Sequence, residues 1–143
     1  MLSDDGSLPE DCALAQWGKY FFEGSKWQLN HPGVSMSHSA VFAGHIFGTA
    51  ADAPKYIKPL MQDAGFVDIE EHILKLPIGP WARDPRLKRV GYLEMLNMTD
   101  GIQGLTMMLF TRALGWRPEE VEVFLANVRK DVENRHIHAY YHL

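Results

Sequence analysis

The feature that most constrains the fold is one long helix-forming segment, residues 84–113. Asp84 and Pro85 form a start signal, because an Asp side chain accepts hydrogen bonds from the free N–H groups of a first turn and Pro fits that turn. Gly115 is a stop signal. Two seams of side chains run along the segment: Met95, Met98, Ile102, Leu105 and Leu109, and Tyr92, Leu96, Thr99, Gln103, Met107 and Phe110. A helix that is apolar on two sides is usually buried or shared with a partner.

Further helices are predicted on both sides of this segment. Apolar residues at steps of three and four predict a helix over 12–23, and Asp52 predicts another that ends near Gly65. Pro59 lies inside that second helix and should kink it or delay its start. Residues 118–132 are amphipathic and form a last helix. A short helix is expected over 39–47, within the least regular part of the chain.

Residues 66–76 are the best candidate for a strand. Val67, Ile69 and Ile73 alternate with polar residues, and the content of β-branched residues fits a strand. One good strand cannot form a stable sheet alone. The fold class predicted is α+β and predominantly α-helical, an intertwined homodimer in which strand 66–76 pairs with its copy across a two-fold axis.

Composition limits the classes of function. A net charge of -4 and an isoelectric point near 5.9 do not fit a nucleic-acid-binding protein. No apolar run approaches the about 20 residues of a membrane span, and the acidic start is unlike a signal peptide. Cys12 is the single cysteine, so an internal disulfide is excluded. We therefore expect a soluble, cytoplasmic protein of one domain, residues 1–143, with no nucleic acid and no membrane among its partners.

Six stretches of the chain together resemble a known family. They are residues 3–9, 15–17, 61–68, 76–85, 114–121 and 128–141. In order and spacing they are similar to the C-terminal part of fungal secondary-metabolism class I methyltransferases. The resemblance implies a truncated, methyltransferase-like substrate domain that lacks the Rossmann half in which S-adenosylmethionine binds. Since no glycine-rich loop follows a predicted strand, we expect no cofactor, and methyl transfer by this chain alone is not expected.

Three residues are candidates for catalysis. His45 and His72 could donate or accept a proton near neutral pH, and Gln103 could fix a ligand by a hydrogen bond. A histidine that is hydrogen-bonded in the core or at an edge is the alternative for each of the two. No metal is expected, because the other histidines lack a standard ligand spacing with acidic or cysteine partners.

A larger set of residues could line a substrate pocket. The resemblance implies that the first helix, the Pro-Trp loop and the long helix wall the acceptor cavity of the family. Side chains of a hydrophobic core are the alternative interpretation. The substrate-binding candidates are Trp17, Tyr20, Phe21, Trp81, Tyr92, Leu96, Thr99, Met107 and Phe110.

Two functions of different classes follow. The first is a cofactor-independent enzyme of natural-product biosynthesis, which cyclises or isomerises a small apolar precursor by a pericyclic, Diels–Alder-type step. Such a step needs a folded substrate and a hydrogen-bond donor rather than a nucleophile. The second is a non-catalytic partner, or a remnant, of a methyltransferase that uses S-adenosylmethionine. Exposed apolar surface on the long helix and an unpaired strand would favour the partner.

Overall fold

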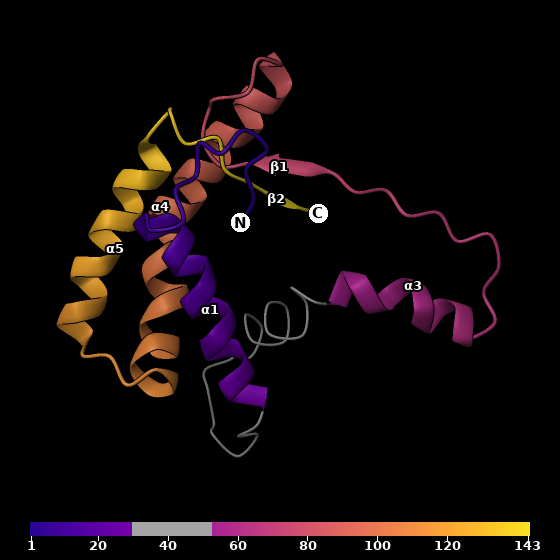
Figure 1. Cartoon of the computed structure of the whole chain (residues 1–143), viewed down its shortest axis with the longest axis horizontal. Helices are drawn as coiled ribbons and strands as arrows, with labels where there is room; N and C mark the ends of the chain where they lie inside the picture. Colours follow the sequence, from indigo (N-terminus) through magenta and orange to yellow (C-terminus); the bar gives the residue numbers. More distant parts are fainter. Residues whose placement is uncertain (30–52) are drawn as a thin grey trace.

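The computed structural model describes residues 1–29 and 53–143 (Figure 1). Those residues form four helices and two short strands. In chain order they are α1 (Ala13–Leu29), α3 (Ala53–Asp63), β1 (Lys75–Pro77), α4 (Pro85–Ala113), α5 (Pro118–Glu133) and β2 (Tyr140–His142). The predominantly helical α+β class is confirmed. The expected helix over 39–47 and His45 lie outside the described residues.

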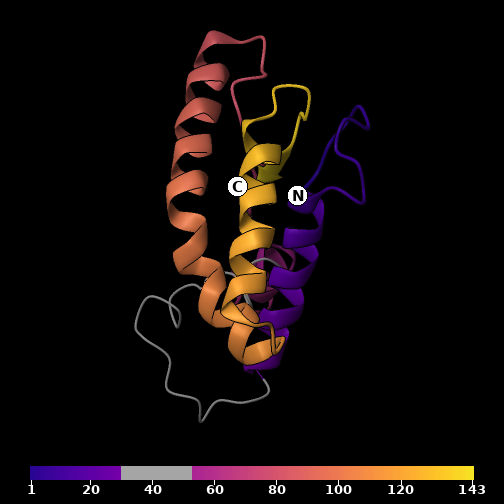
Figure 2. The ribbon, with the colours of Figure 1, turned by 90° about the vertical axis from the view of Figure 1, so that its left-hand side faces the viewer.

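The body of the molecule is a bundle of α1, α4 and α5, which pack side by side (Figure 2). Its core side chains come from all three helices, and Leu14, Phe110 and Leu125 are at most 1% exposed. Full burial of one such side chain contributes about 1.5–3 kcal/mol. Helix α5 shows how the sequence directs this packing, since Val121, Leu125, Val128 and Val132 recur every three or four residues and all are buried.

Helix α4 has the ends predicted from the sequence. The Asp84 carboxylate accepts hydrogen bonds from the backbone N–H groups of Arg86 and Leu87, at 2.7 and 3.1 Å. Among the described residues, one side of this helix packs against the bundle, where Ile102 and Phe110 are buried. The other side exposes large apolar side chains: Leu87, Val90, Tyr92, Leu93, Leu96 and Leu105. None of the helices in the described ranges is long and apolar enough to cross a membrane.

The predicted strand over 66–76 is wrong in its length. Only Lys75–Pro77 forms a strand, and it pairs antiparallel with Tyr140–His142 of the same chain. Hydrogen bonds in both directions between Leu74 and Leu143 extend this ladder by one pair. A strand needs a neighbouring backbone, and the short C-terminal segment provides one only for these residues. Pairing of 66–76 between two copies stays a prediction.

Residues 53–74, called the arm below, project from the bundle (Figure 1). Helix α3 packs against no other helix or strand of the described chain. After it, Phe66, Val67, Ile73 and Leu74 are 59–82% exposed. No backbone hydrogen bond to another described residue involves 67–73. The arm therefore combines exposed apolar side chains, which are unfavourable in water, with an unpaired backbone that is open to pairing with another strand.

Two glycines hold the small sheet against α4. The backbone N–H of Gly79 donates to the carbonyl oxygen of Gly91 at 3.0 Å. Gly79 has a φ of 98°, which favours glycine. A Cβ atom at Gly91 would overlap the carbonyl group of Gly79. Loop and helix can approach this closely only because Gly91 has no side chain.

We predict that Gly91→Ala lowers the free energy of unfolding by about 1–3 kcal/mol, because the backbones must separate to accommodate the methyl group. Gly101→Ala on the same helix is the matched control. A Cβ there meets nothing within 4 Å, so the better helix propensity of Ala should leave stability unchanged or raise it. Urea unfolding followed by circular dichroism measures both. Equal stability of the two variants would contradict the predicted contact.

Candidate functional site

Part of the predicted pocket is hydrophobic core. Trp17, Phe21 and Phe110 are buried at 9%, 7% and 0% exposure. The rings of Trp17 and Phe21 lie 5.0 Å apart. Tyr20 is half-buried and directs its ring edge-on toward Trp116 at 5.2 Å and toward Phe110 at 6.0 Å. These rings pack against one another, as is typical of side chains in a hydrophobic core. Their role in substrate binding stays a prediction.

A buried hydrogen bond links α1 to α4 inside this core. The indole N–H of Trp17 donates to the hydroxyl oxygen of Thr106 at 2.8 Å. Thr106 is fully buried. The sequence analysis missed this residue, although Thr106 lies four residues from both Ile102 and Phe110 and so belongs to the buried side of α4. The bond satisfies two polar groups that would otherwise be costly to bury.

Trp81 has a structural position next to the small sheet. Its indole N–H lies 3.1 Å from the carbonyl oxygens of both Ile78 and Ala139. Its ring stacks on that of His138, with the centroids 5.0 Å apart and the planes at 26°. Trp81 therefore ties the loop before α4 to the segment before β2.

The second predicted seam lies along α4, and its members differ in burial. Tyr92 and Leu96 are exposed, at 47% and 40%. Met107 is half-buried and packs against the core, and the Thr99 hydroxyl donates to the carbonyl of Met95 at 2.7 Å. Gln103 is exposed, and its side-chain amide donates to the Glu122 carboxylate on α5 at 2.5 Å.

The two catalytic candidates among the described residues, His72 and Gln103, lie on different parts of the molecule. His72 lies on the arm, with its side chain 79% exposed and its ring 3.4 Å from the Glu70 carboxylate. Gln103 lies on the bundle, where α4 meets α5. Within residues 1–29 and 53–143 no group of three His, Cys, Asp or Glu residues could hold a metal ion.

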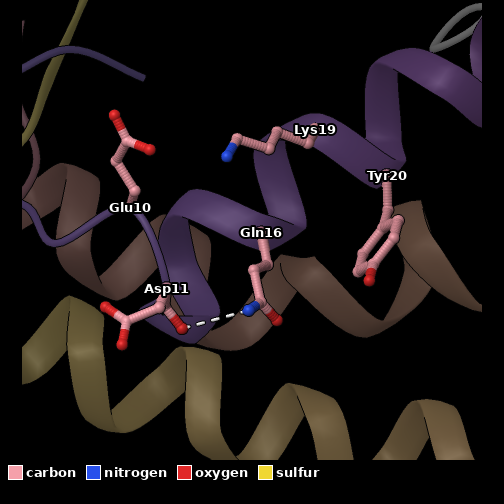
Figure 3. A pocket seen from close by; sticks show the side chains of 5 residues that line it. All are labelled: Glu10, Asp11, Gln16, Lys19 and Tyr20. Atoms are coloured by element: carbon pink, nitrogen blue, oxygen red, sulfur yellow. Dashed lines mark hydrogen bonds between the residues drawn. The ribbon is translucent and has the colours of Figure 1, made fainter.

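A shallow, solvent-open depression lies at the start of α1 (Figure 3). It is lined by Glu10, Asp11, Gln16, Lys19 and Tyr20. The Gln16 side chain donates to the backbone carbonyl of Asp11 at 3.1 Å across it. Binding sites for apolar ligands are usually enclosed and lined by apolar side chains, so this depression does not fit the predicted substrate.

A polar cluster that the sequence analysis did not find joins the two ends of the chain. Asp4 accepts hydrogen bonds from Lys75 and from the Tyr140 hydroxyl, both at 2.5 Å. The bond from Lys75 is the main reason why the pKa of Asp4 is lowered. The hydrogen bond to Asp4 is also the main cause that raises the pKa of Tyr140.

Asp5 holds the same N-terminal segment in place by a second set of hydrogen bonds. Its carboxylate accepts from the backbone N–H of Ser7 at 3.0 Å and lies 2.5 Å from His138 Nδ1. Hydrogen bonds from Ser7 are the largest cause that holds the pKa of Asp5 well below its usual range, and bonds from His138 and Ser3 add to them. The His138 and Asp5 side chains are 38% and 49% exposed, and their contact links the N-terminal segment to the segment before β2.

Several known fungal proteins are similar to nearly the whole of this chain. It is 35% identical over 139 residues to the methyltransferase pytC of Aspergillus terreus, a match that covers 97% of this chain and 37% of that protein. The chain is therefore related to fungal secondary-metabolism methyltransferases. It is 29% identical to the probable methyltransferase tdiE of Emericella nidulans, over 97% of this chain and 38% of that protein. It is 30% identical to the secondary metabolism regulator LAE1 of Cochliobolus heterostrophus, over 96% and 39%.

The chain spans little more than a third of the length of these relatives. No family model and no solved structure matches the sequence. The expected relation to this family is confirmed, and it is confirmed as a partial match.

The described residues do not fit S-adenosylmethionine, the cofactor that the family implies. A strand followed by a loop and a helix occurs once among them, from β1 to α4. Trp81 occupies that loop, and the Asp84 carboxylate already accepts from the first N–H groups of α4. A bound cofactor would find no free glycine-rich turn there.

We predict that Thr106→Val lowers the free energy of unfolding by about 1–3 kcal/mol, because it leaves the buried indole N–H of Trp17 without an acceptor. Thr111→Val is the matched control. Among the described residues, the Thr111 hydroxyl donates to carbonyls of its own helix, at 2.8 Å to Met107, so its loss should change stability little. Thermal unfolding checks both. A Thr106→Val protein as stable as the control would show that the bond is not made.

We predict that Asp5→Asn lowers stability at neutral pH and that the difference disappears in acid. The pKa of Asp5 is lowered in the folded state, so its contribution is present above the unfolded pKa of about 3.9 and is lost as the pH falls through the folded value. Unfolding measured between pH 7 and pH 2 tests this. Glu10→Gln removes an exposed carboxylate from the same end of the chain and is the control for the loss of one negative charge. A difference that stays constant down to pH 2 would contradict the account.

Proposed function

We propose that this chain is the substrate-side part of a methyltransferase that uses S-adenosylmethionine, and that it works with a cofactor-binding part that the described residues do not include. Two findings support the proposal. The relatives are methyltransferases of which the chain matches little more than a third. The described residues have no turn that fits the cofactor. The observation that carries the proposal is the unpaired arm.

The arm has the pattern of a strand that lacks its sheet. Val67, Ile69 and Ile73 alternate with polar residues, so one face is mainly apolar and the other polar. This pattern is typical of a strand with one covered face. A free backbone of this kind can add to the edge of another sheet, with main-chain hydrogen bonds for affinity and alternate side chains for specificity.

The position of the arm favours strand addition over a loose contact. The arm runs directly into β1, which already pairs with β2. A sheet placed beside residues 67–73 would continue this ladder along the same chain. Since a two-stranded sheet is marginal in water, a larger sheet would stabilise both the arm and β1.

Cyclisation or isomerisation without a cofactor remains a second candidate. It is supported by the exposed apolar side chains of Tyr92 and Leu96, which lie on the same seam of α4 as Gln103. A pocket would form there only when a second surface covers the seam. Product formation from an apolar polyene by the purified chain alone, with no S-adenosylmethionine, would favour this function over the first.

We predict that the chain binds the portion of pytC that it does not match, and that Val67→Asp with Ile73→Asp weakens this binding at least tenfold. Charges on the apolar face of the arm would have to be buried in the joined sheet. Isothermal titration calorimetry measures the affinity, and binding of S-adenosylmethionine by the pytC portion shows that it is folded.

The matched control is Val123→Asp on α5. Val123 is 68% exposed and lies away from the arm, so this variant should bind like the unmodified chain. Loss of binding in the control would mean that the effect is not specific to the arm. Absence of binding by the unmodified chain to a folded, cofactor-binding portion would overturn the proposal.

A further inference from the structure

We infer that two copies of this chain associate by exchanging arms, so that the arm of each copy lies on the basic end of α4 in the other. The basic end is defined here as residues 83–93. The inference rests on two exposed surfaces of one chain that match in apolar character and are opposite in charge.

The basic end of α4 carries four cations within seven residues. Arg83, Arg86, Lys88 and Arg89 are all exposed, and no ion pair holds any of them in the part of the chain that the structure describes. The acid among them, Asp84, is engaged in capping the helix. Between these charges Leu87, Val90 and Leu93 are 45%, 39% and 56% exposed. An occupant that is both apolar and acidic would complement this surface.

The arm has those properties. Asp63, Asp68, Glu70 and Glu71 are its acids from residue 59 to residue 74, and no Lys or Arg occurs in that range. In the described part of the chain, the Glu70 carboxylate is paired with His72, at 3.4 Å. The apolar side chains on the same stretch are Phe66, Val67, Ile73 and Leu74, all at least 59% exposed. Complementary potentials of this kind select a partner and set its orientation.

A second copy suits this surface better than the chain's own arm. The arm leaves the body at Leu74, whose backbone is fixed by its pairing with Leu143. From there it runs away from the bundle and from the basic end of α4 (Figure 1). When two copies exchange arms, the same contact forms twice about a two-fold axis and the assembly closes as a dimer.

This inference does not depend on the proposed function. The two uses of the arm exclude each other, however, since residues 67–73 cannot join a sheet and lie on α4 at the same time. A dimer would therefore keep the arm covered until a cofactor-binding part replaces the second copy.

Charge reversal tests the exchange by analytical ultracentrifugation at low salt, where charge pairs are least screened. One variant carries Arg86→Glu and Arg89→Glu, and the other carries Glu70→Arg and Glu71→Arg. In a dimer of either variant alone, both arm contacts bring like charges together. The dissociation constant of that dimer should therefore rise at least tenfold. Mixed together, the two variants should form a heterodimer, because both of its contacts again pair opposite charges.

Lys130→Glu with Arg135→Glu is the matched control. These cations are exposed but lie outside both surfaces, so this variant should dimerise like the unmodified chain. Recovery by mixing also shows that the reversed chains are folded. Three results would each overturn the inference. The first is an unmodified chain that is still monomeric at 100 times the concentration at which the variants are compared. The second is a dimer that persists after either charge reversal, and the third is a pair of monomeric variants that do not associate when mixed.

Discussion

The close backbone contact between Gly79 and Gly91 fixes where the small sheet, and with it both ends of the chain, lies relative to the helical bundle. It brings the loop after β1 against α4 without intervening side chains. The small sheet is thereby fixed to the bundle, and β2 and the N-terminal segment are fixed to the sheet through Tyr140. The chain that leads into β1 must then approach from outside the bundle. The projecting arm is a consequence of this geometry.

Two parts of the molecule therefore differ in how much of their apolar and polar surface has a partner within the chain as described. In the bundle, apolar side chains are buried and the Trp17 indole has an acceptor. On the arm and on the outer side of α4, large apolar side chains are exposed and seven consecutive residues lack a backbone partner among those described. Contiguous apolar exposure of this kind marks interaction sites in soluble proteins. The partial match to longer methyltransferases is in accord with that interpretation.

Local signals predicted where the described helices begin, although α1 continues to Leu29, beyond its predicted end at residue 23. Contacts distant in the sequence explain the failures in the sheet. Asp84, Pro85 and Pro118 set the starts of α4 and α5, because a cap or a first-turn proline acts on its nearest neighbours. The strand over 66–76 was predicted from alternation alone, but a strand also depends on a partner backbone that the sequence does not specify.

The site was less predictable for the same reason. Spacing correctly grouped Trp17 and Phe21 on one face of α1, yet it could not distinguish a pocket wall from a core. The bond from Trp17 to Thr106 and the cluster of Asp5 with His138 join residues 89 and 133 positions apart. No pattern of neighbouring residues reveals such pairs. Only the fold brings them together.

Hydrogen–deuterium exchange of the amides of residues 67–73 tests the central claim that the arm is a strand without its sheet. In the isolated chain, diluted until it is monomeric, these amides should exchange within seconds, whereas those in the middle of α5 should be protected. Addition of the folded, unmatched portion of pytC should then protect them, because each alternate N–H would gain an acceptor. Strong protection of 67–73 in the monomer, or no protection in the complex, would contradict the account.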